Sequence, residues 1–573
     1  MRCTSPVGEL TRPFDACEPD DHVTENAEAV LSDEAAAIAI APRPRRRWSW
    51  RSIHPAAALT TLGITCWVAV FGRLAMRHHT AYGTWSFDMG IYDQGYWLVS
   101  RFKPTFVTVR GLDFWGQHIN LIAYLYAPFY WLGAGPTFLM ATQALVLGLG
   151  AMPVYLIARD RLSAWYGAAF AAAFLLYPAI QFISWANYHP EALVITPFLF
   201  AWWAALRSKW TLYIVMLVLV LITREDAALA VTVLGAVLWI RQWRSKSSAA
   251  APALSSVSSI ASVSSISDVS TSIERGAAGD VVLGRTWTTW IPAGTLVLGA
   301  VWYALCTRVA IPHFNNGEQP FYINYFYQSW GNSMGEVVKN IARHPDRVIS
   351  DATKPDRIRF YRDLVLPLGG LPLAGLGFIA MAAPQLLASV IGASPYARMI
   401  LYQYTAMMIA PIFIATIEGY RRFIHPRPWR RWVIAWMLGC ALVSNIAWSP
   451  SPIGARYGVW ARDNSRVPLL KRAVALVPDD ARLTATYSLL PHLSHRDVVY
   501  DWPNPWRQVS WGNHNENIPN PATVEYLVLD LHHVNASDRD LVDTLIGPGG
   551  EYQTLMNTDD VIVARRTRVG PTP

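Results

Sequence analysis

Long apolar segments separated by short polar ones occupy most of the 573-residue chain. The first apolar segment, residues 55–76, is long enough to cross the roughly 30 Å hydrocarbon core of a bilayer. Comparable segments recur up to residue 448. The pattern therefore predicts an α-helical polytopic membrane protein with about eleven transmembrane helices.

Two segments are harder to assign. Residues 118–132 are apolar but short and contain Pro128, so we expect a helix that lies along the outer interface. The segment after Pro384 is also short, which leaves a re-entrant hairpin open as an alternative to a crossing. The predicted crossings are 55–76, 137–158, 162–184, 190–206, 210–222, 227–240, 288–309, 366–383, the segment after Pro384, 399–417 and 432–448.

Basic clusters fix the predicted orientation. Residues 43–51 and 421–431 are rich in arginine and flank apolar segments. Cytoplasmic loops carry an excess of Lys and Arg, so the N-terminus is predicted to be cytoplasmic and the C-terminus extracytoplasmic. All basic clusters fall inside only if residues 118–132 do not cross. We expect a bacterial plasma-membrane protein.

Composition agrees with this interpretation. The chain is 53% hydrophobic and 15% charged, whereas soluble domains are about 25% charged. Its net charge of +8 comes from short clusters between apolar segments, which indicates membrane topology rather than a nucleic-acid surface. The five cysteines are widely scattered, so neither a disulfide framework nor a zinc site is predicted.

Polar stretches divide the chain further. Residues 1–54 are predicted to be a disordered cytoplasmic tail, and the Ser-rich residues 245–286 a cytoplasmic linker. They delimit an N-terminal membrane module, 55–244, and a C-terminal one, 287–449. The first external loop is placed at 77–136 and a second, aromatic one at 311–365.

After residue 450 the pattern changes to scattered charge and short apolar runs. Residues 468–476 have the spacing of an amphipathic helix, and RLTATY, DVVYDW, EYLVLDL and DVIVARR have the composition of strands. Residues 450–573 are therefore predicted to form a small extracytoplasmic α/β domain.

The candidate chemistry lies in polar interruptions on the predicted outer side. FDMGIYDQGYW places two acids among aromatic residues, and NYHPE and TRED precede later helices. Ionisable residues at such positions are costly unless they are solvated or paired, so they are functional candidates. The candidates are Asp88, Asp93, His118, His189, Glu191, Arg224, Glu225, Asp226 and Tyr404.

Asp88 is the candidate general base. An aromatic setting disfavours the charged form of a carboxylate and makes it more basic, which suits proton abstraction from a substrate hydroxyl. Arg224 could hold a phosphate leaving group. The structural alternatives are that Asp88 and Asp93 cap a short interfacial helix, and that Arg224 only pairs with Glu225 or Asp226.

Several motifs together resemble a bacterial membrane-protein family catalogued as a domain of unknown function. They are FDMGIYDQGYW, GQHINLIAYLYAPFYWLG, YPAIQFISWANYHPEAL, TREDAAL and PHLSHRDVVYDWP, and the resemblance covers about residues 60–565. That family is similar to GT-C glycosyltransferases, which use polyprenyl- or dolichyl-phosphate sugars and carry an acid in the first external loop. Phe87-Asp88 matches two positions of the Phe-Asp-Glu stretch of protein O-mannosyltransferases, and Met89 replaces the Glu. The resemblance implies Asp88 as base or acceptor-orienting residue.

The leading hypothesis is thus a membrane glycosyltransferase that transfers a sugar from a polyprenyl-phosphate donor to an acceptor at the outer face. Membrane lipid and the lipid-linked sugar are the expected partners. A transporter or flippase of a lipid-linked or polar solute, and a non-catalytic scaffold, are the alternatives. The sequence has no metal-ligand motif, and a divalent cation stays open as a cofactor.

Overall fold

The computed structural model describes residues 54–255, 290–512 and 519–567. They belong to one compact unit, His54–Pro573. The predicted cytoplasmic tail lies outside the described residues, except for His54. The helix α12, Ala227–Ser255, continues past residue 245, where the linker was predicted to begin. The rest of that linker also lies outside the described residues.

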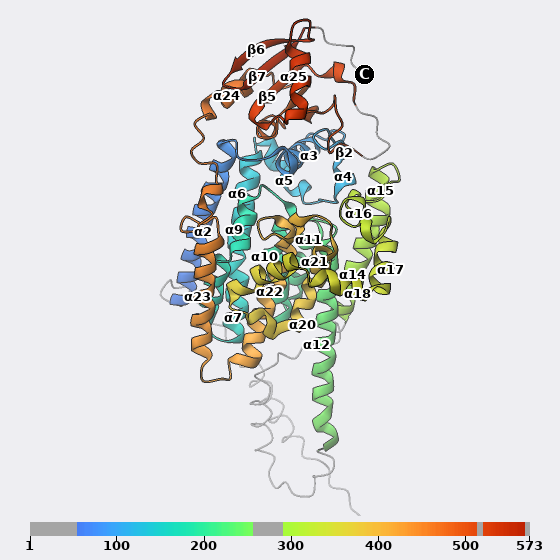
Figure 1. Ribbon diagram of the computed structural model, residues 1–573. Coiled ribbons are helices and arrows are strands. Elements are labelled where there is room, and N and C mark those ends of the chain that lie inside the picture. The colour runs from blue at the N-terminus through green and yellow to red at the C-terminus, as the bar shows by residue number, and fades with distance from the viewer. Residues whose placement is uncertain (1–53, 256–289, 513–518, 568–573) are drawn as a thin grey trace, which may run out of the picture. The chain divides into compact units, whose positions relative to one another are not determined.

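Long apolar helices dominate the structure (Figure 1). Helix α2, Pro55–Thr80, begins with proline at its first position, and the His54 ring accepts a hydrogen bond from the Ala56 amide (3.1 Å). Proline suits this position because its missing N–H is not needed there. By length and composition, five helical stretches of the described residues could cross a membrane: Pro55–Thr80, Pro136–Arg161, Trp290–Phe314, Leu371–Ile391 and Arg430–Trp448.

A sixth span arises if α8, Ala164–Leu175, and α9, Pro178–Trp185, count as one helix bent by 45°. Among the other segments that were predicted to cross, residues 227–240 lie in the 29-residue helix α12, and the remaining ones are shorter or broken. Examples are α11, Trp210–Leu221, and α22, Ala406–Gly419, which contains Pro411 and is buried along its whole length. Helices enclosed by protein need no long lipid-facing surface, so counting apolar segments overstates the number of continuous spans.

The break that was predicted at Pro384 is wrong. Residues Leu371–Ile391 form one candidate span of 21 residues. Pro384 lies in the first turn of α21, Ala383–Ile391, where proline is tolerated. Helix α5, Ala123–Trp131, has only nine residues, about 14 Å of length, and is too short to cross.

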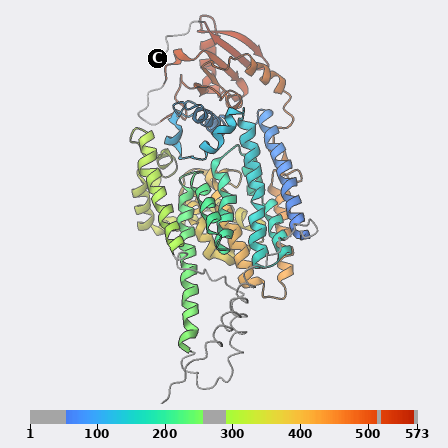
Figure 2. The same cartoon turned by 180° about the vertical axis from the view of Figure 1, so that it is seen from behind.

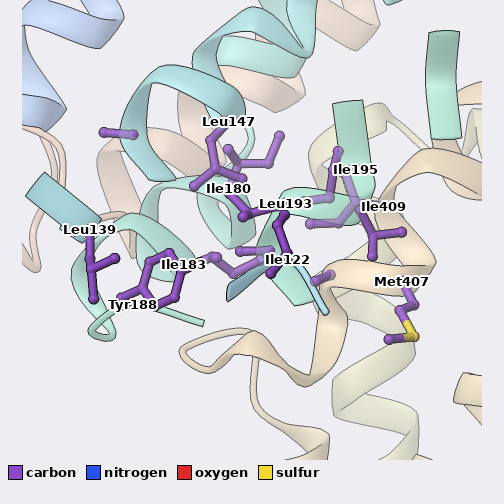
Figure 3. Close-up of a cluster of buried hydrophobic side chains, with 14 of the residues drawn as sticks. Ile122, Leu139, Leu147, Ile180, Ile183, Tyr188, Leu193, Ile195, Met407 and Ile409 are labelled. Atoms are coloured by element: carbon purple, nitrogen blue, oxygen red, sulfur yellow. The ribbon is translucent and has the colours of Figure 1, made fainter. Parts of the chain in front are cut away.

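A tightly packed core underlies the predicted external loops. Figure 3 shows buried side chains that come from separate parts of the chain and meet one another. Burial of each Leu or Ile side chain contributes about 1.5–3 kcal/mol to the stability of the fold. This cluster therefore stabilises the position of the loop that contains His189. The labelled residues are Ile122, Leu139, Leu147, Ile180, Ile183, Tyr188, Leu193, Ile195, Met407 and Ile409.

The C-terminal α/β region, residues 450–573, contains a five-stranded sheet in the order β4-β3-β5-β7-β6. Strands β3, β4 and β5 are parallel, and β7 pairs antiparallel with β5 and β6. The strands are β3 Leu483–Ala485, β4 Val499–Asp501, β5 Tyr526–Asp530, β6 Tyr552–Thr558 and β7 Val561–Arg566, and the main helices are α24 Val467–Ala475 and α25 Arg539–Ile546.

The four strands and the helix expected from the sequence are confirmed, and so is the fold class of a helical membrane protein with a small C-terminal α/β part. Strand β6 was not expected, because most of its residues are exposed and it lacks an apolar face. It is recruited as an edge strand by pairing with β7.

The segment 77–136, which was predicted to be the first external loop, is built against this sheet. In both views its helices α3, Ile91–Ser100, and α4, Phe114–Gln117, lie between the sheet and the long helices (Figures 1 and 2). The Thr108 hydroxyl donates to the Val499 carbonyl (2.8 Å) and accepts from the Val499 amide (2.9 Å). Thr108 lies between β1, Phe106–Val107, and β2, Leu112–Asp113.

Candidate active site

Asp88 occupies a strained turn. Its backbone angles are φ 68° and ψ −73°, a γ-turn conformation that is rare for residues other than glycine. Such a conformation costs on the order of 1–3 kcal/mol and persists only where the surroundings enforce it, often at functional sites. The N-cap of α3 is Gly90, so Asp88 is not the cap of this helix. Its side chain is 32% exposed.

His189 contacts this carboxylate. Its Nε2 lies 3.2 Å from Asp88 Oδ2, and its ring is buried. The His189 amide donates to Gln143 Oε1 (2.7 Å), which fixes the NYHPE loop to α6, Pro136–Leu149. Burial alone would lower the pKa of His189, but the Asp88 carboxylate outweighs it and raises the pKa above its ordinary value. The imidazolium form is therefore favoured beside Asp88.

Arg224 is held by two carboxylates. It bonds Glu191 Oε1 through Nη1 and Asp226 Oδ1 through Nε (2.9 Å), with a second bond to Asp226 Oδ2. The expected pairing with Asp226 thus exists, and Glu191 joins it from a distant part of the chain. Glu191 Oε2 is buried and has no hydrogen-bond partner among the described residues.

Glu225 lies behind this group. It accepts from the Ile119 amide (3.1 Å) and contacts His118 Nδ1 (2.8 Å). Burial raises the pKa of Glu225, but the neighbouring His118 and Arg224 outweigh burial and leave this pKa below its usual range. The TRED segment therefore joins the first external loop to the NYHPE loop by ion pairs, and it positions His118.

These groups border a cavity of about 530 Å³. Its polar and charged lining residues include Asp88, Tyr92, Arg110, Gln117, His118, Glu191, Arg224 and Asp226. Its aromatic lining residues include Phe87, Tyr303, Phe321, Tyr322, Tyr325, Phe326, Tyr327 and Tyr404. Its apolar lining residues include Leu229, Ala230, Met334, Val337, Val338, Ile341, Met381, Leu387, Ala388, Ile391 and Met407.

The structure brings most of the predicted site residues to this cavity. Two of them do not line the cavity but contact a residue that does: His189 contacts Asp88, and Glu225 contacts His118. The predicted residues that line the cavity are Asp88, His118, Glu191, Arg224, Asp226 and Tyr404.

Asp93 does not line the cavity. It is fully buried and accepts hydrogen bonds from the Tyr130 hydroxyl (2.7 Å) and the Ser494 hydroxyl (2.6 Å), and His495 Nε2 lies 3.0 Å away. The structure thus directs Asp93 to the C-terminal α/β region rather than to a substrate site. Asp93 lies in the first turn of α3, whereas Asp88 lies before this helix in the strained turn, so helical spacing does not relate their directions.

Sequence reasoning missed Arg110. Its guanidinium lies over the rings of Phe87 (5.8 Å) and Phe321 (5.1 Å) and donates to the Ser510 carbonyl (2.6 Å). No motif marks this arginine, and its contact with Phe321 of the second loop comes from the tertiary structure. Across the described ranges, no group of three His, Cys, Asp or Glu side chains is placed to hold a metal ion.

Fold and site together define a polytopic membrane protein with a mixed polar, aromatic and apolar cavity beside the C-terminal α/β region. The chain belongs to the family described as predicted membrane protein DUF2079, which matches residues 80–563. The expectation of a membrane-protein family of unknown function is thereby confirmed. No curated protein matches the chain.

Solved structures of glycosyltransferases resemble the chain at low identity. ArnT from Cupriavidus metallidurans bound to undecaprenyl phosphate is 12% identical, with a TM-score of 0.46 over 90% of this chain and 99% of that one. The oligosaccharyltransferase from Archaeoglobus fulgidus in the apo form is 12% identical, with a TM-score of 0.35 over 85% of this chain and 70% of that one.

Proposed function

We propose that this protein is a membrane glycosyltransferase, which transfers a sugar from a polyprenyl-phosphate donor to an acceptor at the outer face of the membrane. The observation that carries the proposal is the cavity, which combines a strained carboxylate, a set of aromatic rings and an apolar wall. A lipid-linked sugar has the matching three parts: a reacting centre, a sugar ring and a hydrocarbon tail.

Asp88 is the proposed base. It removes the proton of an acceptor hydroxyl while that oxygen attacks the anomeric carbon of the donor sugar. The bond between this carbon and the phosphate oxygen breaks, and the polyprenyl phosphate leaves with the electron pair. His189 Nε2 lies 3.2 Å from Asp88 Oδ2, so we assign Oδ1 to the acceptor and propose that the ion pair with His189 directs the carboxylate.

The sugar is proposed to bind among Phe321, Tyr322 and Tyr404, which line the cavity. Glu191 also lines it, and its buried Oε2 is without a hydrogen-bond partner in the described part of the chain. An unsatisfied buried acceptor costs about 1–3 kcal/mol. A sugar hydroxyl that donates to Glu191 Oε2 would remove this cost and would orient the ring.

The donor phosphate is assigned to the guanidinium groups of the cavity, Arg224 and Arg110. Guanidinium binds phosphate through parallel hydrogen bonds. Arg224 already bonds two carboxylates, so it would share its donors between them and the phosphate. The lipid tail would lie along the apolar wall that Val337, Leu387 and Met407 help to form.

The test is the variant Asp88→Asn. Protein in nanodiscs, or in membrane vesicles that supply native acceptors, is given radiolabelled undecaprenyl-phosphate hexose, and sugar transfer is measured. We expect the rate to fall by at least about 100-fold, the usual contribution of a general base. The melting temperature should stay close to that of the wild type, because Asn keeps the shape of the side chain.

Asp543→Asn serves as the matched control, because this carboxyl is exposed on α25 and lies outside the residues that line the cavity. It should transfer sugar at the wild-type rate. Retained transfer in Asp88→Asn would remove Asp88 from the mechanism.

A further inference from the structure

Two segments far apart in sequence run side by side at the strained turn. The Ser86 amide donates to the Tyr487 carbonyl (2.9 Å). At the other end of the turn, a Cβ on Gly90 would lie only 2.4 Å from Leu490 Cδ2. Residues 487–490 therefore hold the chain both before and after Asp88.

The contacts continue along α3 in the same order. Asp93 accepts from Ser494, and Gln94 Nε2 donates to the Arg496 carbonyl (3.2 Å). The contact positions rise together in both segments, so residues 86–94 and 487–497 are matched over their length. This correspondence makes the C-terminal α/β region part of the framework of the first external loop.

The turn itself has no local reason for its conformation. Asp88 has a positive φ although it is not glycine, and a relaxed chain would leave that region. Met89, the next residue, is fully buried. The groups that fix the two ends of the turn, the Tyr487 carbonyl and the Leu490 side chain, are placed to impose this conformation.

We infer that residues 487–497 are a positioning element, which holds Asp88 in its strained turn and thereby directs its carboxylate into the cavity. The claim that a base is being positioned rests on the proposed function. The claim that the turn is enforced from the C-terminal α/β region stands on the contacts alone, and the two parts are tested separately.

The first experiment compares Asp88→Gly with Asp88→Ala by melting temperature. Both variants lose the carboxylate, so their difference reports the backbone conformation. At an ordinary position glycine is the less stable of the two, but at a positive φ alanine carries the strain. We expect Asp88→Gly to melt above Asp88→Ala in the otherwise wild-type protein.

The same pair is then measured with Leu490→Ala, which loosens the contact at Gly90. The order should reverse, with Asp88→Ala melting above Asp88→Gly, because the turn can relax to a negative φ. Should Leu490→Ala fail to accumulate as folded protein, Leu490→Val replaces it, with a smaller loss of contact and the gap between the two variants expected to narrow. An unchanged order and gap in the loosened background, or Ala above Gly in the wild type, overturns the inference.

A size-swap experiment tests the contact directly. Gly90→Ala should lower the melting temperature, and this loss should be smaller in the Leu490→Ala background than in the wild type. Gly439→Ala is the control, because a Cβ at Gly439 meets no atom within 4 Å, and it should leave the melting temperature nearly unchanged. The inference is also overturned if Gly90→Ala lowers the melting temperature by as much in the Leu490→Ala background as in the wild type.

Transfer kinetics test the catalytic half. Leu490→Ala should lower kcat by at least tenfold while the KM for the lipid-linked sugar changes by less than twofold, since the donor site is untouched. Leu555→Ala, at an exposed position of β6, should change neither. If Leu490→Ala and Leu555→Ala change kcat equally, the claim that residues 487–497 position a base is overturned. Absence of transfer in the wild type would instead overturn the proposed function, and the melting comparisons would still decide the conformational part.

Discussion

At the scale of single residues, the acids around the candidate site divide by what they face. Asp88 and Glu191 face the cavity, whereas Asp93 faces partners in the C-terminal α/β region. Asp501, at the end of β4, lies near the turn of Ser86, and burial raises its pKa to about 7. A carboxyl with a raised pKa weakens the native state once the pH is high enough to ionise it.

Asp501→Asn should therefore stabilise the protein more at high pH than at low pH. The pKa of Asp501 in the folded state exceeds the usual Asp value of about 3.8. The wild-type protein therefore loses stability progressively from about pH 4 to 7, and the loss is complete above pH 7. The gain above pH 7 is up to about 4 kcal/mol, at 1.36 kcal/mol per unit. Melting temperatures at pH 5 and pH 8 measure it. The exposed Asp543→Asn should show no such difference, and an Asp501→Asn gain that is equal at both pH values would contradict the prediction.

At the scale of elements, close contacts between helix backbones stabilise the pairing of neighbouring helices. Helices α12 and α14, Trp290–Leu305, pack through small residues. A Cβ on Gly235 would lie 2.4 Å from the Leu296 amide nitrogen, and one on Gly299 would lie 2.7 Å from the Thr232 amide nitrogen. Small residues at such positions let helix backbones approach closely, as in membrane-helix pairs.

Gly299→Leu should separate these helices and lower stability by about 1–3 kcal/mol, the typical cost of overpacking. Gly294→Leu, in the same helix, is the matched control, because a Cβ there meets nothing within 4 Å. Unfolding in denaturant, followed by tryptophan fluorescence, compares the two variants. Equal stability would show that the α12–α14 contact is dispensable.

At the scale of the whole described unit, Asp93 connects three parts of the chain. Its carboxylate joins α3 to Tyr130 of α5 and to the Ser494–His495 pair. Asp93→Ala leaves the buried Tyr130 and Ser494 hydroxyls without this acceptor, which we expect to cost about 1–3 kcal/mol. Limited proteolysis should then cleave the segment 487–511 faster than in the wild type, whereas the exposed Asp543→Ala should leave the cleavage rate unchanged.

The same contact gives a pH dependence with a defined sign. Burial alone would lower the pKa of His495, but Asp93 outweighs it and raises this pKa above its ordinary value. The stabilisation by the ion pair is therefore complete below the usual histidine pKa and is lost as the pH rises through the raised one. Asp93→Asn should flatten the fall in melting temperature over this range. If the melting temperature of Asp93→Asn falls with pH as steeply as that of the wild type, the pH dependence belongs to another group.

Much of the fold follows from local patterns. Long apolar segments dictate membrane helices, alternating segments dictate strands β3, β4, β5 and β7, and the quoted motifs gave the family. Strand β6 and the broken inner spans did not follow, because pairing and enclosure by distant segments decide them. For the same reason the number of apolar segments did not give the number of continuous spans.

For the site, the sequence by itself determined the residue types and their placement in polar loops beside apolar segments, which marked Asp88, His189, Glu191 and Arg224 as candidates. Only the tertiary structure decided their partners. A contact across 33 residues places Glu191 on Arg224. Contacts across about 400 residues turn Asp93 to Ser494 and bring Tyr487 to the turn of Asp88. Local sequence sets which groups a loop offers, whereas long-range packing sets the direction in which each group points.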